Sequence, residues 1–505
     1  MPLRRPSVAD LKKSSESRHL DLTEAELTDF YELVSDNLAL YDELEQYPDP
    51  QRAVLPAIRV PLGRPAPEQD PLNAIVQYCS VKADFSGPLS GKQIGIKDTI
   101  CMAGIPMSCA SRLLYGFTPE IDATIVTRML KAGAHINAVL NTDDFAFSGG
   151  GHTSAYGITK NAANPAHTAG GSSCGSAAAV ATGLVDMAIG GDQGGSIRIP
   201  SSWSGTVGHK PTHGLVPYTG IVGFDLTIDH IGPMTTNVAD AALMLGVLAG
   251  ADENGADPRQ PSVVPMQDYA KALTGDIKGL KIAVIKEGFG SQYGMKEVDD
   301  AVRAAAKALQ KLGAEITEIS LPEHRMVSAV WNAIANEGGV NSFYAGHHAY
   351  QHKGWYYPQL MSAMRRGIKT NGGDFSPTAK LGVLVADYMS DHYNGVFYAR
   401  ARNFSNQINL AYEKVFAQFD LVLMPTTPQT SMKIPASPEA DRKTFIRNAL
   451  NMCANTAAFD LTGHPSISIP CKDVKNLPVG LMLTGRRFDD ATVLRAAHAY
   501  EHSAG

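Results

Sequence analysis

The sequence has no hydrophobic run long enough to cross a membrane and no excess of basic residues. Of its 505 residues, 44 are Lys or Arg and 50 are Asp or Glu, so the formal net charge is −6. A membrane-spanning helix needs about 20 consecutive apolar residues, and the basic first 22 residues lack the apolar segment of a secretory signal. Nucleic acids and anionic membranes attract positive charge. We therefore expect a cytoplasmic protein that binds neither.

Metal-binding and nucleotide-binding motifs are also lacking. The six cysteines are scattered, with no C-x-x-C pair and no matching histidine spacing, so we expect reduced, mostly buried thiols and no metal site. No G-x-x-x-x-G-K-[ST] occurs, and no G-x-G-x-x-G follows an expected strand. The many glycines therefore need a use other than holding a nucleotide phosphate.

Two clusters of Gly and Ser stand close together in the sequence. GGSSCGS covers residues 170–176 and GGDQGGS covers residues 190–196. The alanine-rich segment between them predicts a short helix that ends at Gly183, followed by an apolar strand at residues 187–189. This arrangement brings the second cluster back toward the first. Since glycine accumulates where backbone turns tightly or approaches a ligand, the two loops are expected to build one site.

Ser196 has the surroundings that acyl transfer requires. It follows Gln193, Gly194 and Gly195, whose backbone N–H groups are candidate donors to an oxyanion beside a nucleophilic hydroxyl. No G-x-S-x-G motif surrounds Ser196, and none of the fifteen histidines is singled out as its base. Cys174 in the first cluster is an alternative nucleophile, although a small apolar core residue is the preferred interpretation.

The first seventy residues differ in composition from the rest. Thr23 and Glu26 form a capping box, and apolar residues follow at helical spacing. The predicted helix carries eight acidic and no basic residues between Thr23 and Gln46, whereas residues 1–19 are rich in Lys and Arg. The basic arm and the acidic helix can pair within one chain or between two copies. The helix also has an apolar stripe to bury, and a symmetric dimer is the commonest way to cover such a stripe, so a homodimer is expected.

Seven prolines between Pro48 and Pro71 indicate an extended connector. Residues 1–71 are thus expected to form a helical N-terminal extension with this connector. From residue 72 on, strands alternate with helices, which indicates an α/β fold around a large sheet. Residues 72–505 are the expected catalytic domain, with a helix-rich smaller subdomain at roughly 255–415. The expected strands cover residues 91–98, 281–285, 315–321, 419–425, 466–470 and 479–483, and residues 134–147 are expected to form a strand followed by a loop. The expected helices include residues 123–133 and 298–312.

Three motifs together resemble the amidase signature family: GIKDT at 95–99, GGSSCGSAAAVATG from Gly170, and GGDQGGSIRIP from Gly190. The intervals of 75 residues from Lys97 to Ser172 and 24 from Ser172 to Ser196 are typical of that family. The likeness covers nearly the whole chain and is greatest to amidases encoded beside nitrile hydratases. It implies the amidase-signature fold, a large mixed β-sheet flanked by helices. Cys174 stands where that family usually has glycine.

The resemblance implies a Ser-Ser-Lys triad and no metal or organic cofactor. Ser196 would attack the amide carbonyl, Ser172 would relay its proton, and Lys97 would be the base. The Gly171–Ser172 peptide would be cis. The implied oxyanion hole consists of the N–H groups of Gln193, Gly194, Gly195 and Ser196. Ser173, Asp192 and Arg198 are expected to support these residues.

Lys97 needs a lowered pKa to act as a base at neutral pH. A lone lysine is more often a surface charge, but the end of the apolar strand before Asp98 makes burial of Lys97 plausible, and burial disfavours the cation. Asp98 and Asp192 are expected to hold loops through backbone hydrogen bonds.

Substrate choice is less visible in the sequence. By resemblance, Phe147, Ile228 and Trp331 would line an apolar acyl pocket, although each residue alone is more often part of a core. Such a pocket favours a small-molecule amide with a short aliphatic or aromatic acyl group, and it leaves anilides, esters and carbamates (urethanes) as alternatives. Two rival classes are a glutaminase-type subunit of a glutamine-dependent amidotransferase and an inactive binding protein on the same scaffold.

Overall fold

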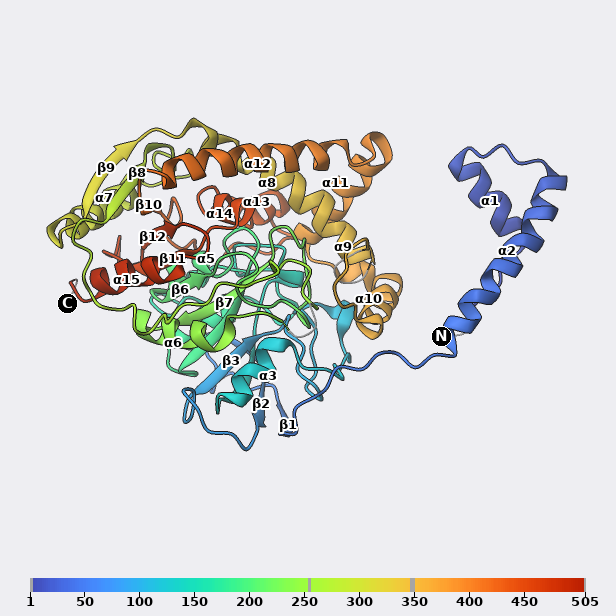
Figure 1. The fold of residues 1–505 in the computed structure, drawn as a ribbon, viewed down its shortest axis with the longest axis horizontal. Helices are drawn as coiled ribbons and strands as arrows, with labels where there is room; N and C mark the ends of the chain where they lie inside the picture. Colours follow the sequence, from blue (N-terminus) through green and yellow to red (C-terminus); the bar gives the residue numbers. More distant parts are fainter. Residues whose placement is uncertain (1–2, 253–255, 346–349, 504–505) are drawn as a thin grey trace. The chain divides into compact units, whose positions relative to one another are not determined.

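The computed structural model describes residues 3–252, 256–345 and 350–503. Contacts divide the chain into two units, Met1–Ala53 and Val54–Gly505 (Figure 1). The boundary expected at residue 71 therefore lies inside the larger unit. In the described ranges, no helix combines the length and the hydropathy needed to cross a bilayer.

The smaller unit is a pair of helices, α1 (Val8–Arg18) and α2 (Glu24–Glu45). The predicted capping box is present, since the Thr23 side chain accepts from Glu26 N and the Glu26 side chain accepts from Thr23 N. The basic arm, for which no helix was expected, forms α1. Ser7 and Asp10 make a second capping box at its start, a signal that the charge of the arm alone does not reveal.

Ion pairs join the basic and acidic segments within this unit. Arg5 contacts Asp42, and Lys12 Nζ lies 2.5 Å from Glu24 Oε1. The pairing of the basic arm with the acidic helix therefore occurs inside one chain. All four side chains are largely exposed, so these pairs add little to stability.

Within the described residues, one mixed sheet of twelve strands organises the larger unit. Its order is β1-β2-β4-β3-β5-β7-β6-β11-β12-β10-β8-β9. Strand β1 pairs antiparallel with β2, so the expected proline-rich connector gives way to sheet earlier than Pro71. The strands are β1 (Ile58–Gly63), β2 (Ile75–Lys82), β3 (Gln93–Lys97), β4 (His135–Leu140), β5 (Met187–Asp192), β6 (Val207–Lys210), β7 (His230–Thr235), β8 (Lys281–Ile285), β9 (Glu315–Ile319), β10 (Leu421–Pro425), β11 (Ser466–Pro470) and β12 (Gly480–Gly485).

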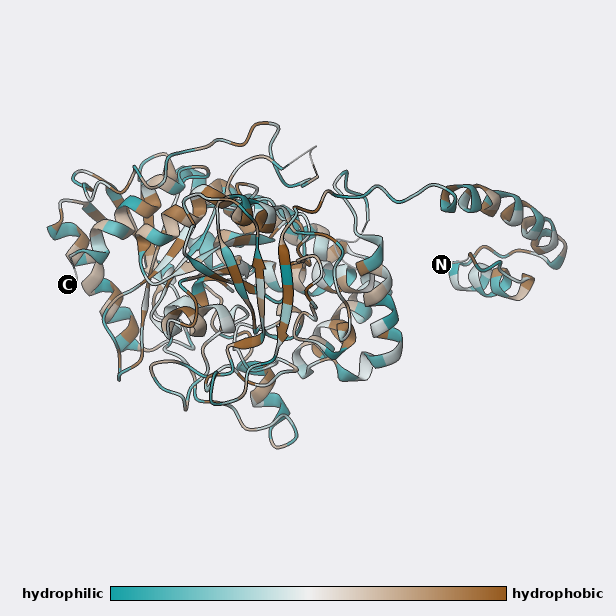
Figure 2. Ribbon diagram, turned by 90° about the horizontal axis from the view of Figure 1, so that it is seen from below, coloured by the Kyte–Doolittle hydropathy of each residue, from teal (hydrophilic) through white to brown (hydrophobic). Residues whose placement is uncertain are grey.

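Helices cover both faces of this sheet, as the alternation of side chains along a strand requires. In β10, Leu421 and Leu423 belong to one hydrophobic core, and Val422 and Met424 belong to another. Figure 2 shows hydrophobic residues along the strands and hydrophilic residues on many outer helix surfaces. The first core includes α3 (Thr124–Lys131), α6 (Val238–Leu248), α7 (Lys296–Lys311) and α15 (Asp490–Glu501), and the opposite side carries α4 (Cys174–Ala181), α5 (Arg198–Ser204), α8 (Val327–Ala333), α12 (Val396–Phe416) and α14 (Ala457–Thr462).

The helix-rich segment shares the core of the sheet. The predicted β-α-β unit is confirmed, because β8 and β9 are parallel neighbours joined through α7. Since β8 also pairs with β10, residues from roughly 255 to 415 do not separate from the rest as a unit; residues 255 and 346–349 lie outside the described ranges. The other helices here are α9 (Val340–Ala345), α10 (Pro358–Asn371) and α11 (Pro377–Tyr393), with α13 (Arg442–Arg447) further on.

Candidate active site

The two Gly/Ser loops lie at the ends of neighbouring strands. Strands β3 and β5 are parallel neighbours, so the end of β3 at Lys97 and the loop after Asp192 lie on the same edge of the sheet. Ser172 lies just before α4, and α4 packs against both strands. The alanine-rich stretch thus connects the loops as the sequence predicts, with the helix ending at Ala181 before the turn at Gly183.

Lys97 and Ser172 are in direct contact inside the protein. The Lys97 ammonium nitrogen, Nζ, donates to Ser172 Oγ at 2.7 Å and to the Gly191 carbonyl at 3.4 Å. Lys97 is 1% exposed. Burial lowers its pKa to about 8, and the nearby carboxylates of Asp143 and Asp192 limit this shift. A neutral Lys97 is therefore accessible near neutral pH. The Gly171–Ser172 peptide is cis.

Ser196 lines a small cavity that has no charged side chain among the described residues of its lining. The volume of the cavity is about 30 Å³. Ser196 is buried, and its carbonyl accepts from Ser173 N at 3.3 Å, which ties the two loops together. The cavity lining consists of Ala146, Phe147, Ser148, Gly149, Gln193, Gly194, Ser196, Ile199, Phe224, Trp331, Leu450 and Cys453.

Three of the four expected oxyanion donors have no partner in the described parts of the chain. These are the N–H groups of Gln193, Gly194 and Ser196, and all three residues line the cavity. The N–H of Gly195, the fourth expected donor, is engaged elsewhere, because it donates to Asp192 Oδ1 at 2.5 Å. That N–H is already used to hold the turn and does not serve an oxyanion.

Side chains from two distant helical segments hold the carbonyls of the same loop. Trp331 Nε1 donates to the Gln193 carbonyl at 2.7 Å, and Thr456 Oγ1 donates to the Gly194 carbonyl at 2.6 Å. We call Trp331 and Thr456 the loop clamps. Because a peptide is planar, a fixed Gln193 carbonyl also fixes the direction of the Gly194 N–H.

The loop clamps explain why both loop positions are glycine. A Cβ at Gly194 would lie 2.6 Å from Trp331 Cζ2, inside the indole ring's contact distance. At Gly195 the backbone has φ +132°, and a Cβ would lie 2.3 Å from Thr456 Oγ1. Only glycine allows this backbone conformation and such close approaches.

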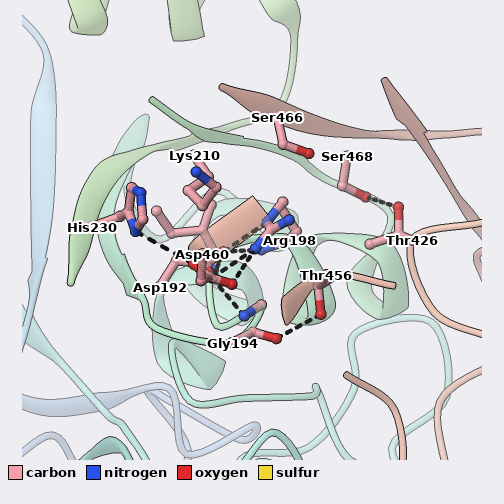
Figure 3. A network of polar contacts seen from close by, with 12 residues as sticks. Asp192, Gly194, Arg198, Lys210, His230, Thr426, Thr456, Asp460, Ser466 and Ser468 are labelled. Carbon is pink, nitrogen blue, oxygen red and sulfur yellow. Dashed lines mark hydrogen bonds and ion pairs between the residues drawn. The ribbon is translucent and has the colours of Figure 1, made fainter. Parts of the chain in front are cut away.

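A buried polar network lies behind the loop (Figure 3). Asp192 accepts a hydrogen bond from Ile197 N at 3.0 Å. It also accepts from Nε and from Nη2 of Arg198, each at 3.0 Å. The same Arg198 NH2 group donates to Asp460 at 2.8 Å. Arg198 and Asp192 therefore support the loop as predicted, and Asp460 is a third member that the sequence did not indicate.

Lys210 lies near this network and interacts with Asp460, Arg198 and Asp192 through charge, with no hydrogen bond or ion pair to them among the described residues. Its ammonium donates to the His464 carbonyl at 2.7 Å. Burial lowers the pKa of Lys210 to about 7 and raises the pKa of Asp460 well above its usual range. Moving one proton from Lys210 to Asp460 neutralises both side chains, so the summed formal charge of Asp192, Arg198, Asp460 and Lys210 is zero in either protonation state.

The substrate residues inferred from resemblance are only partly brought together. Phe147 and Trp331 line the cavity, and the Phe147 ring stacks on Phe224 with centroids 5.3 Å apart. Ile228 is fully buried in the core and is absent from the cavity lining, which corrects its expected position. Sequence reasoning missed the lining residues Ile199, Phe224, Leu450 and Cys453. Ile199 belongs to the motif GGDQGGSIRIP, but no pattern there singles it out, and the other three stand in no distinctive motif.

Cys174 is unsuited to be the nucleophile. It is fully buried at the start of α4, with Sγ 3.6 Å from the Asn141 carbonyl. Burial raises the pKa of the Cys174 thiol to about 12, whereas nucleophilic cysteines are thiolates. Asp98, as predicted, holds a loop by accepting from Ser108 N and Ala110 N. Among the described residues, no group of three or more His, Cys, Asp or Glu could hold a metal ion.

Comparison with known proteins shows the family of the chain. The Amidase family profile matches residues 73–494. An enantioselective amidase of Rhodococcus rhodochrous is 43% identical over 449 residues, which is 87% of this chain and 85% of that protein. A glutamyl-tRNA(Gln) amidotransferase subunit of Geobacillus thermodenitrificans is 38% identical over 424 residues, covering 84% of this chain and 85% of its own length.

A solved structure gives the same picture of the fold. The crystal structure of a bacterial aryl acylamidase of the amidase signature family superposes with a TM-score of 0.72 at 25% identity, covering 87% of this chain and 91% of that chain. The family match takes in both Gly/Ser loops, the strand that ends at Lys97 and the segment that carries Thr456 and Asp460. The chain therefore belongs to the amidase signature family.

Proposed function

We propose that the protein hydrolyses short aliphatic or aromatic carboxylic amides to a carboxylate and ammonia or an amine, through an acyl-enzyme on Ser196. The observation that carries this proposal is the buried 2.7 Å contact between Lys97 and Ser172. A cavity lined by Gln193, Gly194 and Ser196 supports it, because the N–H groups of these three residues have no partner in the described part of the chain. A base of lowered pKa, a relay hydroxyl and an oxyanion site are the parts that acyl transfer needs.

In the first half of the reaction, Ser196 is acylated. Neutral Lys97 takes the hydroxyl proton of Ser172, and Ser172 takes that of Ser196, whose Oγ bonds to the amide carbonyl carbon. The N–H groups of Gln193, Gly194 and Ser196 stabilise the negative oxygen. When the C–N bond breaks, the proton on Lys97 returns through Ser172 to the leaving nitrogen, which departs as ammonia or an amine.

In the second half, water releases the acyl group. Lys97 accepts a proton from water, again through Ser172, and the hydroxide oxygen bonds to the acyl carbon. The same N–H groups hold the new oxyanion. Cleavage of the ester bond returns the proton to Ser196 Oγ and frees the carboxylic acid. No redox step or external proton donor is needed.

The cavity argues against a glutamine-specific enzyme. Glutamine carries both an ammonium and a carboxylate group, and a buried ammonium needs an acidic partner. The cavity at Ser196, which we call the reaction cavity, borders a larger cavity that shares Trp331, Leu450 and Cys453 with it. Among the residues that the structure describes, neither cavity is lined by Asp or Glu. Anilides, esters and carbamates share the shape of an amide and remain alternative substrates of the same triad.

Active-site labelling and a substrate panel test the proposal. A serine-directed fluorophosphonate should label the protein once, at Ser196. Ser196→Ala should lose the label, whereas Ser148→Ala, which alters another serine of the cavity, should keep it. Turnover should be measured on propionamide, benzamide, an anilide, ethyl carbamate and glutamine. Undiminished hydrolysis by Ser196→Ala contradicts the mechanism, and an inactive wild type on all five substrates favours a binding protein.

The remaining expectations concern the whole protein. We infer a cytoplasmic homodimer that takes a small-molecule amide or carbamate as its substrate. The net charge of −6 supports the absence of nucleic-acid and membrane partners, and apolar residues on α2 support self-association.

A further inference from the structure

A second, larger cavity borders the reaction cavity. The volume of this outer cavity is about 620 Å³, compared with about 30 Å³ for the cavity at Ser196. Trp331, Leu450 and Cys453 line both cavities, so the two adjoin along these side chains. When a substrate is larger than a small acyl group with its amide nitrogen, it does not fit in the cavity at Ser196 alone. If its carbonyl lies at Ser196, the rest of the molecule therefore extends past Trp331 into the outer cavity.

The outer cavity presents hydrogen-bond donors. Among the described residues, Arg447 is the only charged side chain of its lining. The two asparagines of the lining have their oxygens engaged, because Asn332 Oδ1 accepts from Asn336 at 3.1 Å and Asn451 Oδ1 accepts from Gln429 at 3.1 Å. No hydrogen bond between described residues uses the side-chain NH2 group of either asparagine. The described lining thus offers the Arg447 guanidinium and the side-chain NH2 groups of both asparagines, and it contains no carboxylate. Asp441, at the start of α13 and outside the lining, interacts with Arg447 through charge.

We propose that the outer cavity binds a carboxylate of the substrate, and that the preferred substrates are amides that carry a carboxylate and no ammonium group. This inference rests on the proposed amide hydrolysis at Ser196. A guanidinium and amide N–H donors complement the two oxygens of a carboxylate. A substrate ammonium would meet Arg447 and no acid, so amino acids such as glutamine are disfavoured while their N-acylated forms are accepted.

The carboxylate has two possible origins in such a substrate, and matched pairs distinguish them. On the amine side, 4-acetamidobenzoate is compared with 4-methylacetanilide. On the acyl side, succinamate is compared with 4-methylpentanamide. Within each pair, the carboxylate replaces a neutral group of similar shape. In at least one pair, the charged member should have a kcat/KM about tenfold higher, and added salt should reduce this advantage because Arg447 is exposed.

Substitutions in and beside the lining test the role of Arg447. Arg447→Gln should raise the KM of the charged member more than that of the neutral member and thereby remove the advantage of the charged member. Arg442→Gln removes the other arginine of α13, which does not line the cavity, and should keep the preference. Asn332→Asp places a carboxylate in the lining and should reverse it.

The outcomes separate this inference from the proposed function. If neutral amides are hydrolysed and both charged members show no advantage, the carboxylate site is wrong and amide hydrolysis stands. The same conclusion follows when Arg447→Gln lowers both members of a pair equally. If no amide in either pair is turned over and the fluorophosphonate does not label Ser196, the proposed function itself fails.

Discussion

At the scale of the residue, the site depends on one buried lysine. A lysine in water holds its proton at neutral pH, with a reference pKa of about 10.4. Burial lowers the pKa of Lys97 to about 8, so a useful fraction is neutral near pH 7 and the fraction grows with pH. The hydroxyl of Ser172 at 2.7 Å then has a base within reach.

Replacement of Lys97 should separate amides from esters. Lys97→Met keeps much of the buried volume but removes both proton transfers, and a loss of about 10²–10⁴-fold is reasonable for each. Amide hydrolysis should suffer more than hydrolysis of a matched phenyl ester, because an amine leaves only after protonation and a phenolate does not need it. Lys92→Met, a partly exposed lysine just before β3, serves as the control. An equal loss on both substrates contradicts an acid role for Lys97.

The wild-type pH profile follows from the same pKa. Protonated Lys97 cannot accept a proton, so the limb of kcat/KM that Lys97 controls should rise from acidic pH and level off above about pH 8. Measurement on propionamide from about pH 5 to about pH 10 checks the sign. A rate that increases toward acidic pH contradicts Lys97 as the base.

At the scale of the element, three separate segments converge on one loop. The strand β5 delivers the loop, α8 contributes Trp331, and the start of α14 contributes Thr456. Thr456 lies 262 residues from Gly194 in the sequence, yet their hydrogen bond is 2.6 Å long. The C-terminal part of the chain therefore helps to form the oxyanion site.

Loss of the Thr456 hydroxyl should lower kcat with little change in KM. Thr456→Val keeps the side-chain shape and releases the Gly194 carbonyl. The same peptide carries the Gly195 N–H that holds the turn, so the turn loosens and the neighbouring N–H groups of Gly194 and Ser196 lose alignment toward the transition state. We expect a decrease of about tenfold, smaller than the loss from deleting an oxyanion donor itself. Thr456→Ser should recover most of the activity. Thr182→Val removes a comparable hydroxyl-to-carbonyl bond at the end of α4 and should be neutral; an effect on KM alone would contradict the clamp role.

The sequence predicted most elements near the site, and physical reasons separate these from the misses. Strands such as β3 and β5 are short apolar runs, and the two loops carry glycines, so local patterns sufficed. The approach of Trp331, Thr456 and Asp460 depends on tertiary packing that no local pattern encodes. Gly195 was misjudged for a related reason, since only the folded loop brings its N–H to Asp192 at 2.5 Å.

At the scale of the whole molecule, α2 and the residues just after it carry an apolar stripe that the described residues of their own unit leave exposed. Phe30, Leu33, Leu40, Leu44 and Tyr47 are 44–65% exposed, and with Asn37 they repeat at alternating intervals of three and four residues. Such a repeat is typical of helices that pair side by side. Dimerisation through this unit stays a prediction. The sequence pattern pointed to another set of apolar residues, Leu27, Phe30, Tyr31, Val34, Leu38 and Tyr41, of which only Phe30 belongs to the exposed stripe, and α1 was not foreseen.

Full-length protein should be a dimer that separates when charge enters this stripe. Leu33→Glu with Leu40→Glu should give a monomer by light scattering, because two buried carboxylates would face their copies. Leu384→Glu, which alters an equally exposed leucine on α11, should leave the dimer intact. A monomeric wild type contradicts the prediction. A truncated chain should begin at Val54, since removal of residues up to 71 deletes β1 from the sheet.

The neutral sum of the buried charges behind the loop has an evolutionary consequence. Removal of Asp192 or Arg198 leaves its ion-pair partner uncompensated in the interior, where breaking a buried pair costs about 3–5 kcal/mol. Single changes at these positions are therefore strongly selected against, while paired changes that preserve neutrality are tolerated. Among related chains, positions 460 and 210 should vary together, although 250 residues separate them in the sequence, and substitution of Asp460 by a neutral residue should accompany loss of the lysine.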